Sequence, residues 1–157
     1  MKTKLLLGLS LLSIPFMGYA NGYVQFNLVN ISPSLAFPRV EVQQGSFNYY
    51  YMSYSGAQPP VGCPTYDNPA YAPLSVPFDV SKVKSTVFTF TPPDLDVCMS
   101  GQEGSNFIAI VGLLITEVNE MDAPHCGAAN NLQSPTDVEQ ATLGIARTAN
   151  SVNCVSS

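Results

Sequence analysis

Charged residues are scarce in this sequence, and basic residues are the scarcest among them. Only 11% of the 157 residues are charged, with six Lys and Arg against eleven Asp and Glu. Nucleic-acid binding needs cations along the phosphate backbone, so this class of partner is disfavoured. Electrostatic docking on anionic lipid is disfavoured for the same reason. The surface must instead be covered largely by Ser, Thr, Asn, Gln and backbone groups.

Histidine is almost absent, and no serine lies in a nucleophile motif. A serine or cysteine nucleophile needs a neighbouring base, and His125 is the only histidine in the sequence. Ser105 lies in the sequence Glu-Gly-Ser-Asn-Phe, which is not a Gly-x-Ser-x-Gly elbow. We therefore predict no catalytic residue, cofactor or metal ligand, and an enzyme is the less favoured class.

No apolar run is long enough to span a membrane, which takes about 20 residues. At the N-terminus, Lys2 and Lys4 precede a short apolar segment that contains Pro15. This segment ends in Gly18-Tyr19-Ala20, which puts small residues at the −3 and −1 positions of a cleavage site. The layout predicts a secretory signal peptide over residues 1–20, with a membrane anchor as the weaker alternative.

Removal of this leader leaves residues 21–157, enough chain for one domain. Four basic residues then stand against eleven acidic ones, so the formal charge of the mature chain is −7. We predict a single β-rich domain that is secreted or periplasmic and has no stable membrane insertion after cleavage. The sequence does not predict the oligomeric state.

Four cysteines remain in the mature chain, and they predict two disulfides. A four-cysteine zinc site is the alternative, but zinc ligands usually come in close pairs. These cysteines are spaced 35, 28 and 28 residues apart. Three connectivities are possible, and we favour the one that joins neighbours in sequence. It pairs Cys63 with Cys98 and Cys126 with Cys154.

The segment Asn106–Val118 is the most apolar part of the mature chain. Its β-branched and aromatic residues favour a long buried strand over a buried helix. Gly112 in its middle predicts a kink or bulge. Other segments also alternate like strands: residues 24–30, 84–91, and the pair 40–43 and 47–52, which we expect to form a hairpin.

Two further segments are ambiguous or irregular. Six prolines between Ser55 and Pro77 predict a long ordered loop without regular structure. Residues 94–98 are compatible with a short strand. Residues 135–147 begin with helix-start chemistry at Ser134 and Pro135, yet also alternate like a strand, and we slightly favour a helix. Together these patterns predict a mainly β protein, a single antiparallel β-sandwich with two disulfides and possibly one C-terminal helix.

Tyrosines form the most suggestive cluster in the sequence. Exposed aromatic residues with few charges are typical of surfaces that bind proteins or sugars. The alternative is that they are ordinary core and edge residues of a sheet, where tyrosine is common. The predicted binding residues are Tyr49, Tyr50, Tyr51, Tyr54, Tyr66 and Tyr71.

Acidic residues offer two weaker candidates. Glu117, Glu120, Asp122 and His125 are ligand types that suit a metal ion, but a solvated acidic loop explains them more simply. The pair in Asp94-Leu95-Asp96 could serve a glycosidase only with a second acid opposite, and turn residues are the simpler explanation.

Three functions therefore remain open. The first is an exported, non-enzymatic binding protein that uses the aromatic surface to hold a protein or carbohydrate. The second is a small exported hydrolase or metal-dependent enzyme centred on residues 117–125. The third is a structural subunit of a surface assembly, which low charge and an apolar chain would suit.

Overall fold

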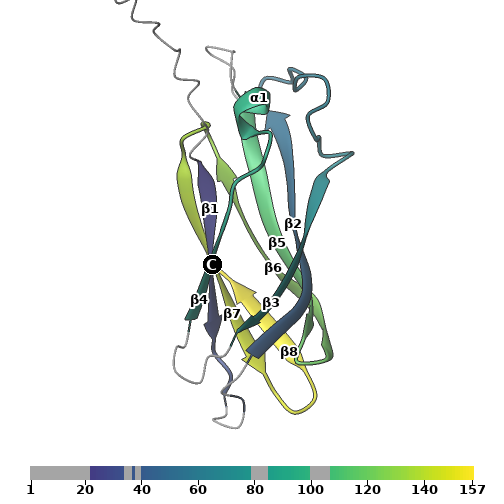
Figure 1. Ribbon diagram of the computed structural model, residues 1–157, viewed down its shortest axis with the longest axis vertical. Helices are drawn as coiled ribbons and strands as arrows, with labels where there is room; N and C mark the ends of the chain where they lie inside the picture. The colour runs from purple at the N-terminus through teal and green to yellow at the C-terminus, as the bar shows by residue number, and fades with distance from the viewer. Residues whose placement is uncertain (1–21, 34–36, 38–39, 79–84, 100–106) are drawn as a thin grey trace, which may run out of the picture.

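The computed structural model describes residues 22–33, 37, 40–78, 85–99 and 107–157. Two four-stranded sheets pack face to face over one hydrophobic core (Figure 1). The predicted mainly β, sandwich-like fold with two disulfides is confirmed. The predicted signal peptide at residues 1–20 and the domain boundary after it lie outside the described residues, so both remain predictions.

The first sheet has the strand order β4-β1-β7-β8. Its strands are β1 (Tyr23–Asn30), β4 (Ser85–Phe90), β7 (Val138–Arg147) and β8 (Val152–Ser156). β1 runs antiparallel to β4 but parallel to β7, while β7 and β8 are antiparallel. The sandwich therefore contains one parallel pair, which a purely antiparallel fold would lack.

The second sheet has the order β3-β2-β5-β6, and all its neighbours are antiparallel. Its strands are β2 (Val40–Ser53), β3 (Ala70–Phe78), β5 (Phe107–Val118) and β6 (Met121–Leu132). One short helix, α1 (Leu95–Met99), lies at one end of the sandwich (Figure 1). In the described part of the chain, no helix combines the length and hydrophobicity needed to cross a bilayer.

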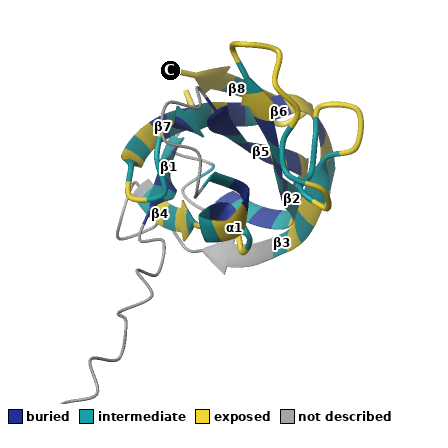
Figure 2. Ribbon diagram, turned by 90° about the horizontal axis from the view of Figure 1, so that it is seen from above, coloured by how far each residue is buried: buried dark blue, intermediate teal, exposed yellow. Residues whose placement is uncertain are grey.

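Inward-facing residues alternate along the strands and fill the space between the sheets. Val24, Phe26 and Leu28 come from β1, and they meet residues of β2 and β5 such as Phe47 and Val111. Figure 2 shows the buried positions lining the interior of the ring of strands. A period of two is the pattern that a strand with one face in the core requires.

The predicted central strand is confirmed as β5, which lies between β2 and β6. Its first half is buried on both faces, and its second half alternates between buried and exposed residues. The register of β5 is regular at Gly112, so the predicted bulge is not there, and the irregular register lies between Ile115 and Glu117. Gly112 is instead a close-approach position, where a Cβ atom would collide with the side-chain oxygen of Asn48.

The predicted hairpin at residues 40–52 is also wrong. Residues 40–53 form one continuous strand, β2, with register shifts between Val42 and Gly45. A Cβ atom on Gly45 would lie 2.7 Å from the Leu114 carbonyl oxygen. The glycine therefore allows a bulge rather than a reversal of the chain, since two backbones come close at this point.

The proline-rich segment is partly regular, contrary to our prediction. Its last part forms β3, although this strand contains Pro73 and Pro77. β3 is an edge strand, so a residue without an N–H need not break a ladder between two strands. Proline density alone therefore overestimated the length of the loop.

The C-terminal helix is a wrong prediction, because residues 138–147 form β7. Ala141, Leu143 and Ile145 face the core, and Gly144 gives room to the side chain of Ile31. The residues expected to start the helix form a turn, in which Gly22 N donates to the carbonyl oxygen of Pro135. Pairing with β1 overrides the local capping pattern.

Two other segments have a different structure from the one predicted from the sequence. Residues 95–99 are helical rather than a short strand, and the N–H of Cys98 donates to the carbonyl oxygen of Asp94. The polar segment after Val118 is not a loop but the hairpin between β5 and β6. Asn119 and Glu120 adopt positive φ there, as two-residue hairpin turns require.

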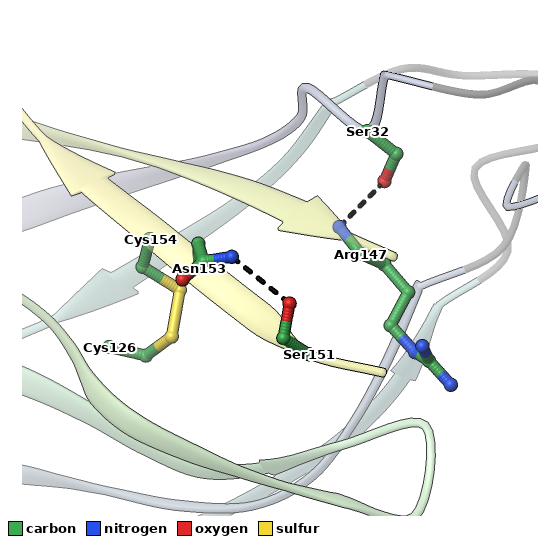
Figure 3. Close-up of a disulfide and its surroundings, with 6 residues drawn as sticks. All are labelled: Ser32, Cys126, Arg147, Ser151, Asn153 and Cys154. Atoms are coloured by element: carbon green, nitrogen blue, oxygen red, sulfur yellow. Dashed lines mark hydrogen bonds between the residues drawn. A yellow bond between two sulfur atoms is a disulfide. The ribbon is translucent and has the colours of Figure 1, made fainter. Parts of the chain in front are cut away.

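Both favoured disulfides, Cys63–Cys98 and Cys126–Cys154, are present. The second joins β6 to β8 and therefore ties the two sheets together, as Figure 3 shows. The first joins the loop before β3 to α1. The cysteine sulfurs are therefore not available for a zinc site, which was the alternative.

A matched pair of leucines on β5 tests which face of the strand is buried in the core. Leu113 is 2% exposed and Leu114 is 39% exposed. Leu113→Ala should lower the free energy of unfolding by about 2–5 kcal/mol, because it leaves a cavity in the core. Leu114→Ala should cost less than about 1 kcal/mol. Urea denaturation followed by circular dichroism measures both, and equal losses would contradict the assigned faces.

The disulfide between the sheets should contribute strongly to stability. Replacing Cys126 and Cys154 together with alanine should lower the free energy of unfolding by about 3–4 kcal/mol, because the unfolded chain regains the entropy of an open loop. Chemical denaturation of the double variant checks this value. An unchanged denaturation midpoint would show that the bridge does not constrain the fold.

Candidate functional site

The six predicted binding tyrosines divide into an inner and an outer group. Tyr49 and Tyr51 point into the core and are 6% and 1% exposed. Their rings lie edge to face, 6.3 Å apart, and Tyr49 also contacts Phe90. Both side chains are buried, so neither can present its ring to a ligand on the surface.

The outer group lies on the opposite face of β2, on the loop that follows it and on β3. Tyr54, Tyr66 and Tyr71 are 65%, 75% and 67% exposed. Tyr50 is half-buried and its ring meets that of Tyr66 edge to face, with 5.6 Å between centroids. We call Tyr50, Tyr54, Tyr66 and Tyr71 the tyrosine surface.

The register of the sheet places Tyr71 on the same face as Tyr50. Tyr71 lies directly opposite Asn48 on β2, and Tyr50 is two residues further along that strand. Residues that are diagonal in this way are within reach of aromatic side chains. The tyrosine surface therefore runs from the outer face of β3 across β2 to the loop.

The outer face of this sheet is uncharged over three successive rows of residues. Such rows are read from the register, since directly opposed residues share a face. The rows are Tyr50, Ile110 and Asn131; Tyr71, Asn48, Gly112 and Ala129; and Pro73, Ser46, Leu114 and Gly127. A shallow hollow of about 330 Å³ lies over the second and third rows, beside Asn48, Gly112 and Gly127. The face is thus apolar in large part and supplied with amide groups.

The loop that carries Tyr54 and Tyr66 is held at several points. The N–H of Tyr51 donates to the carbonyl oxygen of Pro64 at 2.9 Å. Thr65 and Asn68 exchange two backbone hydrogen bonds, and Cys63 is bonded to Cys98. A second hollow, of about 220 Å³, lies between this loop and β2 and is lined in part by Met52, Gln58 and Tyr66.

A partly buried hydrogen bond connects the start of α1 to the core. The hydroxyl of Tyr51 donates to the carboxylate of Asp94 at 2.6 Å. Burial raises the pKa of Tyr51 well above its ordinary value, and the hydrogen bond and negative charge of Asp94 raise it further. Burial likewise raises the pKa of Tyr49, with a smaller contribution from Asp94. Both phenols therefore remain neutral in the folded protein.

Asp94, the first residue of the predicted acidic pair, thus has a structural partner. Asp94 accepts from Tyr51, and its carbonyl oxygen accepts from Cys98 N at the start of α1. Asp94 lies in the turn before α1, as the simpler prediction has it, whereas Asp96 lies in the first turn of the helix itself.

The acidic and histidine residues at 117–125 are spread over the β5–β6 hairpin. Glu117 and Asp122 are register partners, and His125 is exposed with a φ of 65°. Within the described ranges, no group of three His, Cys, Asp or Glu side chains is placed to hold a metal ion. The predicted solvated loop is a hairpin. Its acidic and histidine side chains do not come together as the metal-dependent alternative would require.

Sequence reasoning missed the contribution of Asn48 and Met52 to the outer face, because their neighbours in space come from other strands. The alternation of inward and outward residues along β2 was the only sequence signal that could have placed both side chains on the outer face. Comparison of the chain with protein-family models, with curated proteins and with solved structures finds no match.

The Tyr51–Asp94 bond should make stability fall at alkaline pH. Unfolded Tyr51 ionises near pH 10.0, whereas the folded protein keeps this proton because the pKa is raised. The unfolded state therefore binds fewer protons above pH 10, and the free energy of unfolding falls as pH rises. Tyr51→Phe should cost about 1.5–3 kcal/mol at neutral pH and should show a shallower alkaline decline.

Urea denaturation between about pH 7 and pH 11 measures both effects. Tyr49 is retained in the variant and serves as an internal reference for the remaining slope. Parallel pH profiles for the two proteins would contradict the assigned role of Tyr51.

Proposed function

We propose that the protein is an exported, non-enzymatic binding protein that holds an uncharged ligand against the tyrosine surface. The observation that supports this most directly is the exposure of Tyr54, Tyr66 and Tyr71 beside a disulfide-bonded loop. Tyrosines that only stabilise a sheet would be covered, as Tyr49 and Tyr51 are.

Rigid aromatic rings make efficient contacts because little side-chain entropy is lost on binding. Tyrosine has two rotatable side-chain angles and offers both an apolar face and a hydroxyl group. The ring of Tyr66 is further restrained by its contact with Tyr50. The surface is thus ordered before a ligand arrives, which lowers the cost of association.

The composition of the face favours a neutral ligand. The three outer rows of the sheet contain no charged side chain, so a strongly charged ligand would find no ion pair there. Asn48 and Asn131 offer amide donors and acceptors next to the rings. A carbohydrate matches this combination, because its ring faces can stack on tyrosine while its hydroxyl groups bond to amides.

A protein partner is the second candidate. Met52 and Val61 extend the exposed apolar area beyond the tyrosines, and Val61 is fully exposed. Tyrosine and methionine are enriched in protein–protein interfaces. The carbohydrate is preferred because the two hollows near the rings are shallow, and among the residues that the structure describes neither hollow offers a deep pocket for an anchoring side chain.

Export is part of the same proposal. Two disulfides are typical of proteins that fold in an oxidising compartment, and the predicted leader at residues 1–20 would direct the chain there. We propose a secreted or periplasmic location on these grounds.

An array of neutral and acidic oligosaccharides tests the function. The oxidised chain 21–157 should bind neutral glycans, and Tyr66→Ser with Tyr71→Ser should weaken binding about 5-fold or more, since each ring contact contributes about 0.5–1.5 kcal/mol. Val138→Ser with Val155→Ser is the matched control, because both valines are exposed on the other sheet.

Two outcomes would contradict the carbohydrate proposal. Equal weakening by the tyrosine and valine variants would show that the tyrosine surface is not the site. Absence of neutral-glycan binding would leave the protein partner as the remaining form of the proposal. A photo-crosslinker at position 66, compared with one at position 138, then tests for such a partner in the exporting cell.

A further inference from the structure

The loop between β2 and β3 contains a tight turn that carries an aromatic ring next to a carboxylate. Tyr66 and Asp67 are its two central residues. Thr65 and Asn68 close the turn by exchanging two backbone hydrogen bonds, of 3.2 and 3.0 Å. The segment just before the turn is held to β2 by a backbone hydrogen bond and to α1 by a disulfide. The ring and the carboxylate are therefore presented together from a fixed piece of backbone.

Both side chains line the hollow of about 220 Å³ between this loop and β2. The rest of its lining comes from the end of β2 and from residues 56–59 and 65 of the loop. The loop lies at the same end of the sandwich as α1 (Figure 1). Pockets that enclose a whole drug-sized ligand measure about 300–1,000 Å³. The hollow is therefore of a size for one small unit, such as a single sugar ring, and not for a whole oligosaccharide.

Asp67 is the single acidic or basic residue that lines this hollow. Its side chain is exposed, and within the described part of the chain no hydrogen bond or ion pair engages its carboxylate. Asp94 differs, because its carboxylate already accepts from the hydroxyl of Tyr51. An ionised carboxylate only accepts hydrogen bonds, and it does so through two oxygens. The carboxylate of Asp67 is therefore available to accept hydrogen bonds from a ligand.

We propose that this hollow binds the terminal sugar ring of the ligand, and that Asp67 selects a neutral ring with two adjacent free hydroxyl groups, a step that rests on the carbohydrate function proposed above. One face of the sugar ring packs on Tyr66, and the two hydroxyl groups donate to the two carboxylate oxygens of Asp67. Hydrogen bonds to a charged acceptor are about twice as strong as those between neutral groups.

The other side chains of the hollow suit the remaining parts of a sugar ring. Gln58 and Thr65 offer an amide and a hydroxyl group as further hydrogen-bonding partners. Met52 is 38% exposed and supplies apolar lining for the C–H groups of the sugar. The rest of the oligosaccharide would then extend over the tyrosine surface.

The same carboxylate discriminates against acidic sugars. A negative charge on the terminal ring would lie close to Asp67, and like charges brought together across an interface lower the affinity. No lysine or arginine is among the residues that line the hollow, so none there offsets the repulsion. The neutral rows of the sheet merely fail to attract an anion, whereas Asp67 repels it. The selectivity for a neutral terminal ring is thus assigned to one residue.

Isothermal titration calorimetry of the oxidised chain 21–157 tests this with tetrasaccharides of glucose, galactose or mannose. Each sugar is used in three forms: unmodified, with the primary alcohol of the terminal ring oxidised to a carboxylate, and with two adjacent terminal hydroxyl groups methylated. The wild-type chain should bind at least one unmodified sugar about 10-fold or more tighter than either of its modified forms, because each modification removes hydrogen bonds to Asp67 or adds repulsion.

Asp67→Asn keeps the shape of the side chain and removes its charge. It should weaken binding of the unmodified sugar about 5-fold or more, whereas binding of the oxidised sugar should stay equal or improve. A merely structural role would weaken both. Asp122→Asn is the matched control, since it makes the same change at an exposed aspartate on β6, and it should keep the wild-type preference.

Circular dichroism shows whether each variant is folded, and the methylated sugar tests the wild-type protein without any substitution. A folded Asp67→Asn variant that keeps the wild-type preference would overturn the role of Asp67 and leave carbohydrate binding intact. Equal binding of all three forms by the wild-type chain would do the same. If no tetrasaccharide binds the wild-type chain, both this assignment and the carbohydrate form of the proposed function are overturned.

Discussion

The burial of Tyr49 and Tyr51 in the core is the contact on which the candidate site depends. Because strand residues alternate, placing these two rings inside forces Tyr50 onto the outer face. The hydroxyl of Tyr51 then holds Asp94 and with it the start of α1. Cys98 on that helix holds Cys63, and so restrains the loop that carries Tyr66. A core contact is thus connected step by step to the exposed rings.

The scarcity of charge has a direct consequence in this fold. It leaves three successive rows on the outer face of the β3-β2-β5-β6 sheet neutral, which favours an uncharged ligand at the tyrosine surface.

Local patterns predicted a good part of the fold, and tertiary contacts decided the rest. Alternation identified β1 and β4, and apolar composition identified β5. The C-terminal helix was wrong because pairing of β7 with β1, more than a hundred residues away in sequence, outweighed the capping residues at 134–139. β3 was missed because its prolines are harmful inside a sheet and tolerated at its edge. Neither the parallel pairing nor the edge position is visible in one sequence.

The sequence predicted the cluster of six tyrosines but not which of them face the core and which face the solvent. Alternation separated Tyr50 from Tyr49 and Tyr51, yet only the packing of the sheets decides which side is covered. Gly45 and Gly112 were interpreted as a turn and a kink, whereas both allow close contacts between neighbouring strands. Such contacts depend on the register, which the sequence of a single strand does not fix.

Amide hydrogen exchange of residues 51–68 tests most directly whether the core holds the tyrosine surface in place. The comparison is between the native chain and a variant with Cys63 and Cys98 replaced by alanine. The account predicts that the amides of Tyr51, Cys63 and Thr65, which donate backbone hydrogen bonds, lose protection in the variant. The amides of β5 should stay protected. Unchanged protection at all three positions would contradict the account, because the loop would then be ordered without its link to α1.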